Sequence, residues 1–143
     1  MTLTTKEKDA IIEECNKWKD EYGDMTMEER KKLGAFYTPG ELIIEMIECL
    51  DNIDPDEDYE DPAAGNGNIL AALMLCGVKP NHIYCNELDV STLERCKKRL
   101  NDLAMKLYGE TIPESHFRHA DALTEEAYFL KEPTFMEKFG RVK

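Results

Sequence analysis

The feature that most constrains this chain of 143 residues is a glycine turn near its centre, Asp61-Pro62-Ala63-Ala64-Gly65-Asn66-Gly67-Asn68-Ile69-Leu70. Two glycines one residue apart allow a tight turn and a close approach of the backbone to another group. The turn follows an acidic residue and leads into an apolar run, so we expect it to connect a strand to the N-terminus of a helix, where backbone N–H groups can bind a ligand. An ordinary strand-to-helix turn that uses glycine for geometry alone is the alternative.

The glycine spacing argues against a nicotinamide or flavin cofactor. Such dinucleotides are held by a G-x-G-x-x-G turn, and Leu70 stands where the third glycine would be. A ligand at this turn is therefore expected to belong to another class.

Length and composition indicate a single intracellular domain. The chain has room for one core but not for separate cofactor and substrate domains. No apolar run approaches the roughly 18 residues of a membrane span, and the N-terminus lacks the apolar core of a signal peptide. Five widely spaced cysteines form no C-x-x-C pair, so we expect buried thiols in a reducing compartment and no metal site. The expected location is cytoplasmic, without membrane contact.

The net charge of −12 disfavours unaided binding to duplex DNA, because proteins that grip DNA present a basic face to its phosphates. A compact basic cluster, Lys97-Lys98-Arg99, is expected to be a solvated helix face. DNA is therefore expected to be reached only through a partner.

The N-terminal part of the chain reads as helical. Apolar residues at helical spacing from Thr5 to Tyr22 predict an amphipathic helix that packs on the same domain, with a partner protein as the alternative. Thr26 and Glu29 have the spacing of a capping box and predict a short charged helix that ends at Leu33-Gly34.

A further helix is expected after Thr38, ahead of the first strand and the central turn. Thr38 is placed to cap it, with Pro39 at its first position. We expect this helix to bury five apolar side chains, Leu42, Ile43, Met46, Ile47 and Leu50.

From residue 51 onward, strand and helix signals alternate, which predicts an α/β fold. The carboxylate-rich run from Asp51 to Asp61 leaves few apolar residues for the first strand, so that strand is expected to be short. A long helix over 91–107, capped by Ser91, is expected to bury Leu93, Cys96, Leu100, Leu103, Ala104 and Leu107. The remaining elements are a helix over 69–76, a strand over 83–85 and a strand over 115–123.

Glu87 is the strongest candidate for a ligand-binding carboxylate. It follows the second strand and lies 20 residues after Gly67. In a Rossmann-like βαβ unit an acidic side chain about 20 residues after the turn holds a ribose diol, since a carboxylate can accept hydrogen bonds from both hydroxyl groups. Asp89 is the competing candidate, although it can instead favour the N-terminus of the following helix.

Two motifs resemble those of one enzyme family. D-P-x-x-G-x-G at Asp61 to Gly67 resembles the first motif of S-adenosylmethionine-dependent DNA adenine methyltransferases, and the earlier Phe36-Tyr37-Thr38-Pro39 resembles their N-terminal motif. From Phe36 to Asp121 the chain is similar to the cofactor half of adenine-N6 DNA methyltransferases of restriction-modification systems and phages. The resemblance implies a truncated Rossmann-like methyltransferase sheet with N-terminal helices, divided into a helical segment over 1–34 and an incomplete cofactor-binding domain over 35–143.

The resemblance also implies a set of residues that bind S-adenosylmethionine. The loop at Phe36 would fold over the methionine end, and Asp121, in an A-D-A-L setting, would contact the adenine amino group. Capping of the turn at Thr124 is the alternative role for Asp121. The residues implied to bind the cofactor are Phe36, Tyr37, Thr38, Asp61, Pro62, Ala63, Gly65, Gly67, Asn68, Glu87, Leu88, Asp121 and Ala122.

The catalytic motif of that family is not found in this sequence. These enzymes use N/D/S-P-P-Y/F to hold an adenine flipped out of the duplex, and all six prolines here stand alone. No catalytic residue is therefore assigned, and whether the chain is itself an enzyme stays open.

Three hypotheses about function follow. The chain is the cofactor-binding part of an adenine-N6 DNA methyltransferase completed by missing sequence or a second chain, or it is a non-catalytic phage or regulatory module that binds cofactor or a partner protein. The third is a methyltransferase for a small substrate, which needs no basic face.

Overall fold

The computed structural model describes residues 1–19, 26–28 and 38–124. Within them lie helices α1 (Thr5–Lys17), α3 (Gly40–Glu48), α4 (Asn68–Leu75) and α5 (Val90–Tyr108), and strands β1 (Tyr59–Asp61), β2 (Ile83–Asn86) and β3 (Phe117–Arg118). Short 3-10 helices precede β2 and β3 at Pro80–His82 and Glu114–His116. The mixed α/β architecture is confirmed. Tyr22, Glu29, Phe36, Tyr37 and the residues after 124 lie outside the described ranges.

The sheet has three parallel strands in the order β1-β2-β3. Tyr59 is paired with Ile83, and Cys85 with Phe117. β1 has only three residues, as its carboxylate-rich sequence predicts. Because the strands are parallel, their carboxyl ends at Asp61, Asn86 and Arg118 meet at one edge of the sheet.

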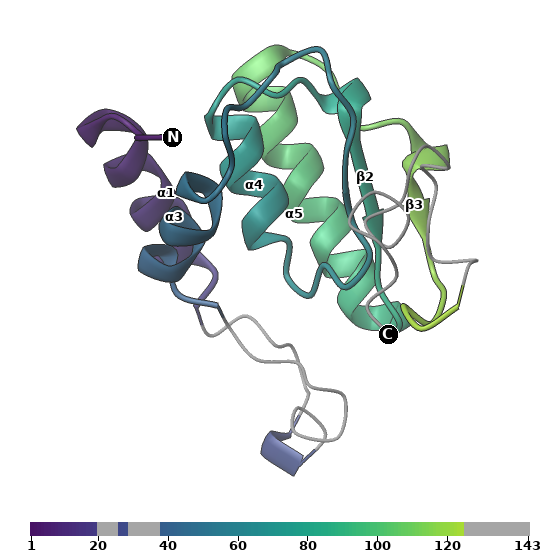
Figure 1. Cartoon of the computed structure of the whole chain (residues 1–143). Helices are drawn as coiled ribbons and strands as arrows, with labels where there is room; N and C mark the ends of the chain where they lie inside the picture. The colour runs from purple at the N-terminus through teal and green to yellow at the C-terminus, as the bar shows by residue number, and fades with distance from the viewer. Residues whose placement is uncertain (20–25, 29–37, 125–143) are drawn as a thin grey trace, which may run out of the picture.

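Helix α4 lies at the centre of the layers. Figure 1 shows α1 and α3 on one side of α4, with α5 and the strands on the other. The main core forms where α4 and α5 pack on the sheet, around the fully buried Leu70, Ile83, Cys85 and Leu100. Among the described residues, no helix is long and apolar enough to cross a membrane.

Helix α1 packs on the rest of the chain, as its apolar stripe predicts. Ile11 and Cys15 are buried against Ile43 and Ile47 of α3 and Ala72 of α4 in a second core cluster. Thr4 caps the helix in a capping box with Glu7. α1 ends at Lys17, so Trp18 is its C-cap rather than part of the stripe.

Two predictions about α3 are wrong. Pro39, not Thr38, is the N-cap, because the Pro39 carbonyl accepts the first backbone hydrogen bonds of the helix, from Leu42 and Ile43. The buried face also differs: Ile43, Ile44 and Ile47 face α1 and α4, whereas Leu42, Met46 and Leu50 are exposed.

The α5 region brings further corrections. Asp89, not Ser91, caps the helix, since its side chain accepts the Thr92 N–H. Leu107 is 39% exposed, and Arg99, predicted to be solvated, is 1% exposed.

The cysteines are only partly as predicted. Cys49 is exposed and Cys76 is half-buried, so the buried thiols that the sequence predicts are the other three, Cys15, Cys85 and Cys96.

The third strand is also shorter than predicted. Residues 114–116 form a 3-10 turn in which His116 Nδ1 is hydrogen-bonded to the Ile83 carbonyl and its ring stacks on Tyr84. This leaves a strand of two residues, so Asp121 lies in a turn beyond β3 rather than at its end.

Candidate functional site

The carboxyl ends of the three strands are joined through Asn86, the last residue of β2. Its Nδ2 donates to the Pro62 carbonyl after β1 and to the Ala120 carbonyl after β3, both at 2.8 Å. Because both partners are acceptors, the orientation of this amide is unambiguous. Asn86 is fully buried, and its Oδ1 has no hydrogen-bond partner among the described residues. One side chain therefore holds together the loops that carry Asp61 and Asp121.

The two glycines of the central turn have different surroundings. Both have positive φ, +58° at Gly65 and +88° at Gly67. A Cβ at Gly67 would lie 2.9 Å from Cys96 Sγ and 3.2 Å from Leu100, so the close approach there is to α5. A Cβ at Gly65 would meet nothing within 4 Å. Of the two positions, Gly65 is the one that presents backbone to open space.

Glu87 is joined to the glycine turn. Its Oε1 accepts the Gly65 N–H at 3.0 Å, and its Oε2 accepts the Asp89 N–H at 2.8 Å. A carboxylate has about four lone-pair sites, so both oxygens can accept a further hydrogen bond. Asp89 is occupied differently, because its Oδ2 accepts from Ser91 Oγ and from both the N–H and the hydroxyl of Thr92. These bonds, with that of the Thr92 hydroxyl first, lower the pKa of Asp89.

Asp61 adds a second carboxylate at this edge. Burial raises its pKa, and the nearby Glu87 carboxylate raises it further, while the hydrogen bond from the Ala63 N–H partly offsets the rise. The ionised form of Asp61 is thus disfavoured where two negative charges share a partly buried position. A cation bound here would offset the repulsion between the two carboxylates.

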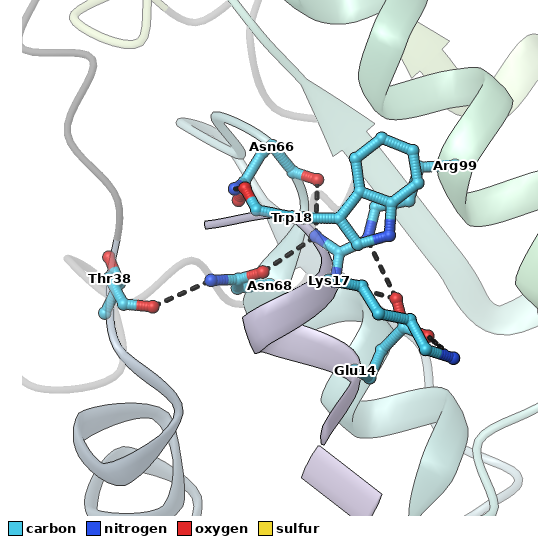
Figure 2. Close-up of polar contacts among 7 residues, drawn as sticks. All are labelled: Glu14, Lys17, Trp18, Thr38, Asn66, Asn68 and Arg99. Atoms are coloured by element: carbon cyan, nitrogen blue, oxygen red, sulfur yellow. Dashed lines mark hydrogen bonds and ion pairs between the residues drawn. The ribbon is translucent and has the colours of Figure 1, made fainter. Parts of the chain in front are cut away.

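A hydrogen-bond network around Arg99 contacts the glycine turn (Figure 2). Its Nη1 donates to the Asn66 carbonyl at 2.8 Å and to Asn68 Oδ1 at 2.7 Å, and its Nε and Nη2 donate to Glu14 Oε2 of α1. Asn68 Nδ2 donates in turn to the Thr38 carbonyl at 2.7 Å. Asn68 is buried, and its amide groups are directed at protein partners. We call these residues, together with Trp18, the Arg99 network.

The other predicted site residues lie in different settings. Leu88 is 49% exposed and lies next to Glu87. Asp121 is exposed, and its Oδ1 accepts the Leu123 N–H at 2.9 Å, which is the turn-capping alternative. Ala122 and Pro62 are half-buried, and Ala63 is exposed. Phe36 and Tyr37 lie outside the described ranges.

The histidines of this region bind protein carbonyls. His119 Nε2 is hydrogen-bonded to the Leu88 carbonyl at 2.7 Å. Over the described ranges, no group of three His, Cys, Asp or Glu side chains is arranged to hold a metal ion.

Sequence reasoning missed three residues that build the site: Asn86, Arg99 and Glu14. A signal for two of them exists. Arg99 falls between Cys96 and Leu100 on the buried stripe of α5, and Glu14 falls next to Cys15 on the stripe of α1. A charged residue at a core position of a helix predicts a buried partner.

Comparison with known proteins identifies relatives of the chain. The model of the N-6 DNA Methylase family matches residues 22–137, which is most of the chain. The Type II methyltransferase M.VspI of Vibrio sp. (strain 343) is 34% identical over 74 residues, which are 52% of this chain and 18% of that protein. The match thus covers less than a fifth of that relative's length. No solved structure matches the chain.

Proposed function

This chain belongs to the N-6 DNA methylase family, and we propose that it binds S-adenosylmethionine at the carboxyl ends of its three parallel strands. We infer that the sheet is the first part of a Rossmann-like methyltransferase sheet, in which ligands bind at that edge. The observation that carries the proposal is the bond between the Glu87 carboxylate and the Gly65 N–H, which brings the acidic residue after β2 to the turn after β1.

Each part of this edge suits one part of the cofactor. Glu87 accepts hydrogen bonds from the two ribose hydroxyl groups with the lone pairs that the Gly65 and Asp89 N–H groups leave available. The exposed Leu88 offers an apolar surface for the adenine ring, and Asp121 and Ala122 are the residues proposed to contact its amino group. The N-terminus of α4, where Gly67 caps without a side-chain bond, favours the methionine carboxylate.

Electrostatics favour this cofactor over a nucleoside triphosphate. S-adenosylmethionine carries a sulfonium and an ammonium group, whereas ATP carries several negative charges. Asp61 and Glu87 are both carboxylates, burial and their mutual repulsion raise the pKa of Asp61, and the chain has a net charge of −12. A cation is therefore attracted to this edge and a triphosphate repelled.

Methyl transfer to DNA adenine uses residues outside this sequence. That sequence contains no Pro-Pro pair, and M.VspI extends far beyond the matched part. A second chain or further C-terminal sequence supplies the N/D/S-P-P-Y/F motif and the contact with DNA. The acidic charge favours a basic partner, which also suits the alternative of a non-catalytic module that binds one.

A thermal-shift titration tests the binding step. A ligand that binds only the folded chain raises Tm with its concentration. We expect S-adenosylmethionine to raise Tm and ATP to leave it unchanged; equal shifts would contradict the proposal. For the transfer step, we expect N6-methyladenine in DNA only when the chain is combined with a partner that carries the catalytic motif, and none with the chain alone.

A further inference from the structure

We propose that Arg99 is a positioning residue that fixes the cofactor-binding turn to helix α1, so that α1 forms part of the site without touching the ligand. This inference rests on the proposed function. The family match begins at residue 22, whereas Glu14 and Trp18 precede it. The N-terminal helix is thus a support for the site that lies outside the matched region.

The guanidinium of Arg99 holds three segments at once. From α5 it reaches the Glu14 carboxylate in α1, at 3.1 Å from Nη2 and 3.2 Å from Nε. On its other side Nη1 holds the Asn66 carbonyl and the Asn68 side chain, which are the two residues flanking Gly67. Only a planar group with several donors makes these contacts simultaneously, so lysine cannot replace it.

Asn68 extends the network to the loop before α3. Its Oδ1 accepts from Arg99 and its Nδ2 donates to the Thr38 carbonyl, 30 residues earlier in the chain (Figure 2). Thr38 is one of the residues proposed to bind the cofactor. The turn and Thr38 are therefore both positioned by contacts that lead back to one side chain, Arg99.

Trp18 completes the contact from α1. The Arg99 guanidinium carbon lies 5.2 Å from the centre of the Trp18 ring, and the Trp18 carbonyl accepts from Asn66 Nδ2 at 3.4 Å. The ring and Glu14 thus face the same guanidinium from the C-terminal end of α1. Stacking and ion pairing together fix its orientation.

The charges in this network are buried, with Arg99 1% and Glu14 9% exposed. A buried ion pair contributes little net stability compared with apolar residues, but it fixes which groups meet. Preorganisation of a binding loop raises affinity by lowering the ordering cost of binding. The network is therefore expected to act on cofactor affinity more than on the stability of the core.

The test replaces both charges at once, in the double variant Glu14→Met/Arg99→Met. Removing both leaves no buried charge without a partner, while the contacts to Asn66 and Asn68 are lost. Lys98→Met is the matched control, because Lys98 is the neighbouring cation, is exposed, and pairs only with Asp102 among the contacts observed. If the double variant does not fold, Glu14→Gln, which keeps the side-chain volume, is measured in its place.

Two quantities are measured, and neither is the global free energy of unfolding. The first is the Kd for S-adenosylmethionine, which we expect to rise about tenfold if the binding-competent turn falls to about a tenth of the population. The second is amide hydrogen exchange, in the ligand-free protein, of Gly67 and Ala71, whose N–H groups donate to the Ala64 and Gly67 carbonyls of the turn. Exchange there is expected to become at least tenfold faster relative to the core amides of Leu100 and Leu103, and Lys98→Met is expected to match the wild type.

The outcomes separate this inference from the proposed function. A Kd within twofold of wild type, with unchanged exchange in the turn, overturns the positioning role. If the wild type binds no S-adenosylmethionine, the proposed function fails, and the exchange measurement alone decides whether Arg99 orders the turn.

Discussion

The Glu87 carboxylate accepts the backbone N–H of Gly65 at 3.0 Å, across 22 residues of sequence. This bond joins the acidic residue that follows β2 to the positive-φ glycine after β1. It gives the glycine turn a defined position relative to a carboxylate.

Replacing Glu87 with alanine is expected to weaken S-adenosylmethionine binding by about 10- to 100-fold, because a charged hydrogen bond contributes about 1.5–3 kcal/mol. The same change removes the acceptor of the Gly65 and Asp89 N–H groups. We therefore also expect a loss of about 1–3 kcal/mol in the free energy of unfolding. Calorimetry and urea denaturation measure the two effects.

Asp89→Ala is the matched control for this position. It removes the N-cap of α5, at a cost of about 1 kcal/mol, and leaves the Glu87 side chain in place. Its affinity for S-adenosylmethionine is expected to be that of the wild type. Equal binding by Glu87→Ala and the wild type would show that the ribose assignment is wrong.

Gly65 and Gly67 are expected to respond differently to alanine. Gly67→Ala places a methyl group 2.9 Å from Cys96 Sγ at a positive φ, so we expect a loss of about 2–4 kcal/mol of stability. Gly65→Ala meets no atom within 4 Å and is expected to cost only about 1–2 kcal/mol from its φ, while its methyl group obstructs the cofactor. Thermal denaturation and binding of the folded variants distinguish the two; a Gly65→Ala protein with unchanged affinity would place the ligand elsewhere.

Asp61→Asn is expected to stabilise the ligand-free protein at neutral pH. The pKa of Asp61 is raised in the folded state, so this group contributes most stability below the usual aspartate pKa of about 4, and that contribution is lost as pH rises through the raised value. Asparagine is never ionised and can still accept the Ala63 N–H. The difference in unfolding free energy, measured by urea denaturation, should be smallest near pH 3 and grow toward pH 7. A difference that is independent of pH would contradict the raised pKa.

Asn86→Asp tests how the three strand ends are held together. Aspartate has the same size but cannot donate to the Pro62 and Ala120 carbonyls when ionised. We expect a loss of about 3 kcal/mol or more at neutral pH, because two carbonyls lose their donor and a carboxylate is buried. The exposed Asn81→Asp is the control and is expected to change stability by less than about 0.5 kcal/mol. Equal unfolding curves for the two variants would argue against the joining role of Asn86.

Much of the fold follows from local sequence signals. Within the described ranges, the order of helices and strands, the short β1 and the place of Glu87 directly after β2 are confirmed, since turn residues and apolar spacing act over a few residues. The helix face that α3 buries was predicted wrongly, because Leu42 and Ile44 are equally apolar and only the position of α1 decides between them.

The residues that hold the site in place could not be predicted from such local signals. Arg99 stands in a basic cluster that resembles a solvated face, and its partner Glu14 is 85 residues away in the sequence. Asn86 donates to two backbone carbonyls, and because every residue has a carbonyl, the sequence does not indicate which ones are its partners. The residues assigned to the cofactor stay predictions, which measurements of S-adenosylmethionine binding test.

Calorimetric titration of the wild-type chain with S-adenosylmethionine, and with ATP in parallel, tests the central claim most directly. Both ligands contain adenosine, and only one carries a sulfonium cation, which the Asp61 and Glu87 carboxylates are expected to attract. We predict saturable binding of S-adenosylmethionine at sub-millimolar concentration and no measurable binding of ATP. The absence of heat with S-adenosylmethionine, or equal affinity for both ligands, would contradict the account.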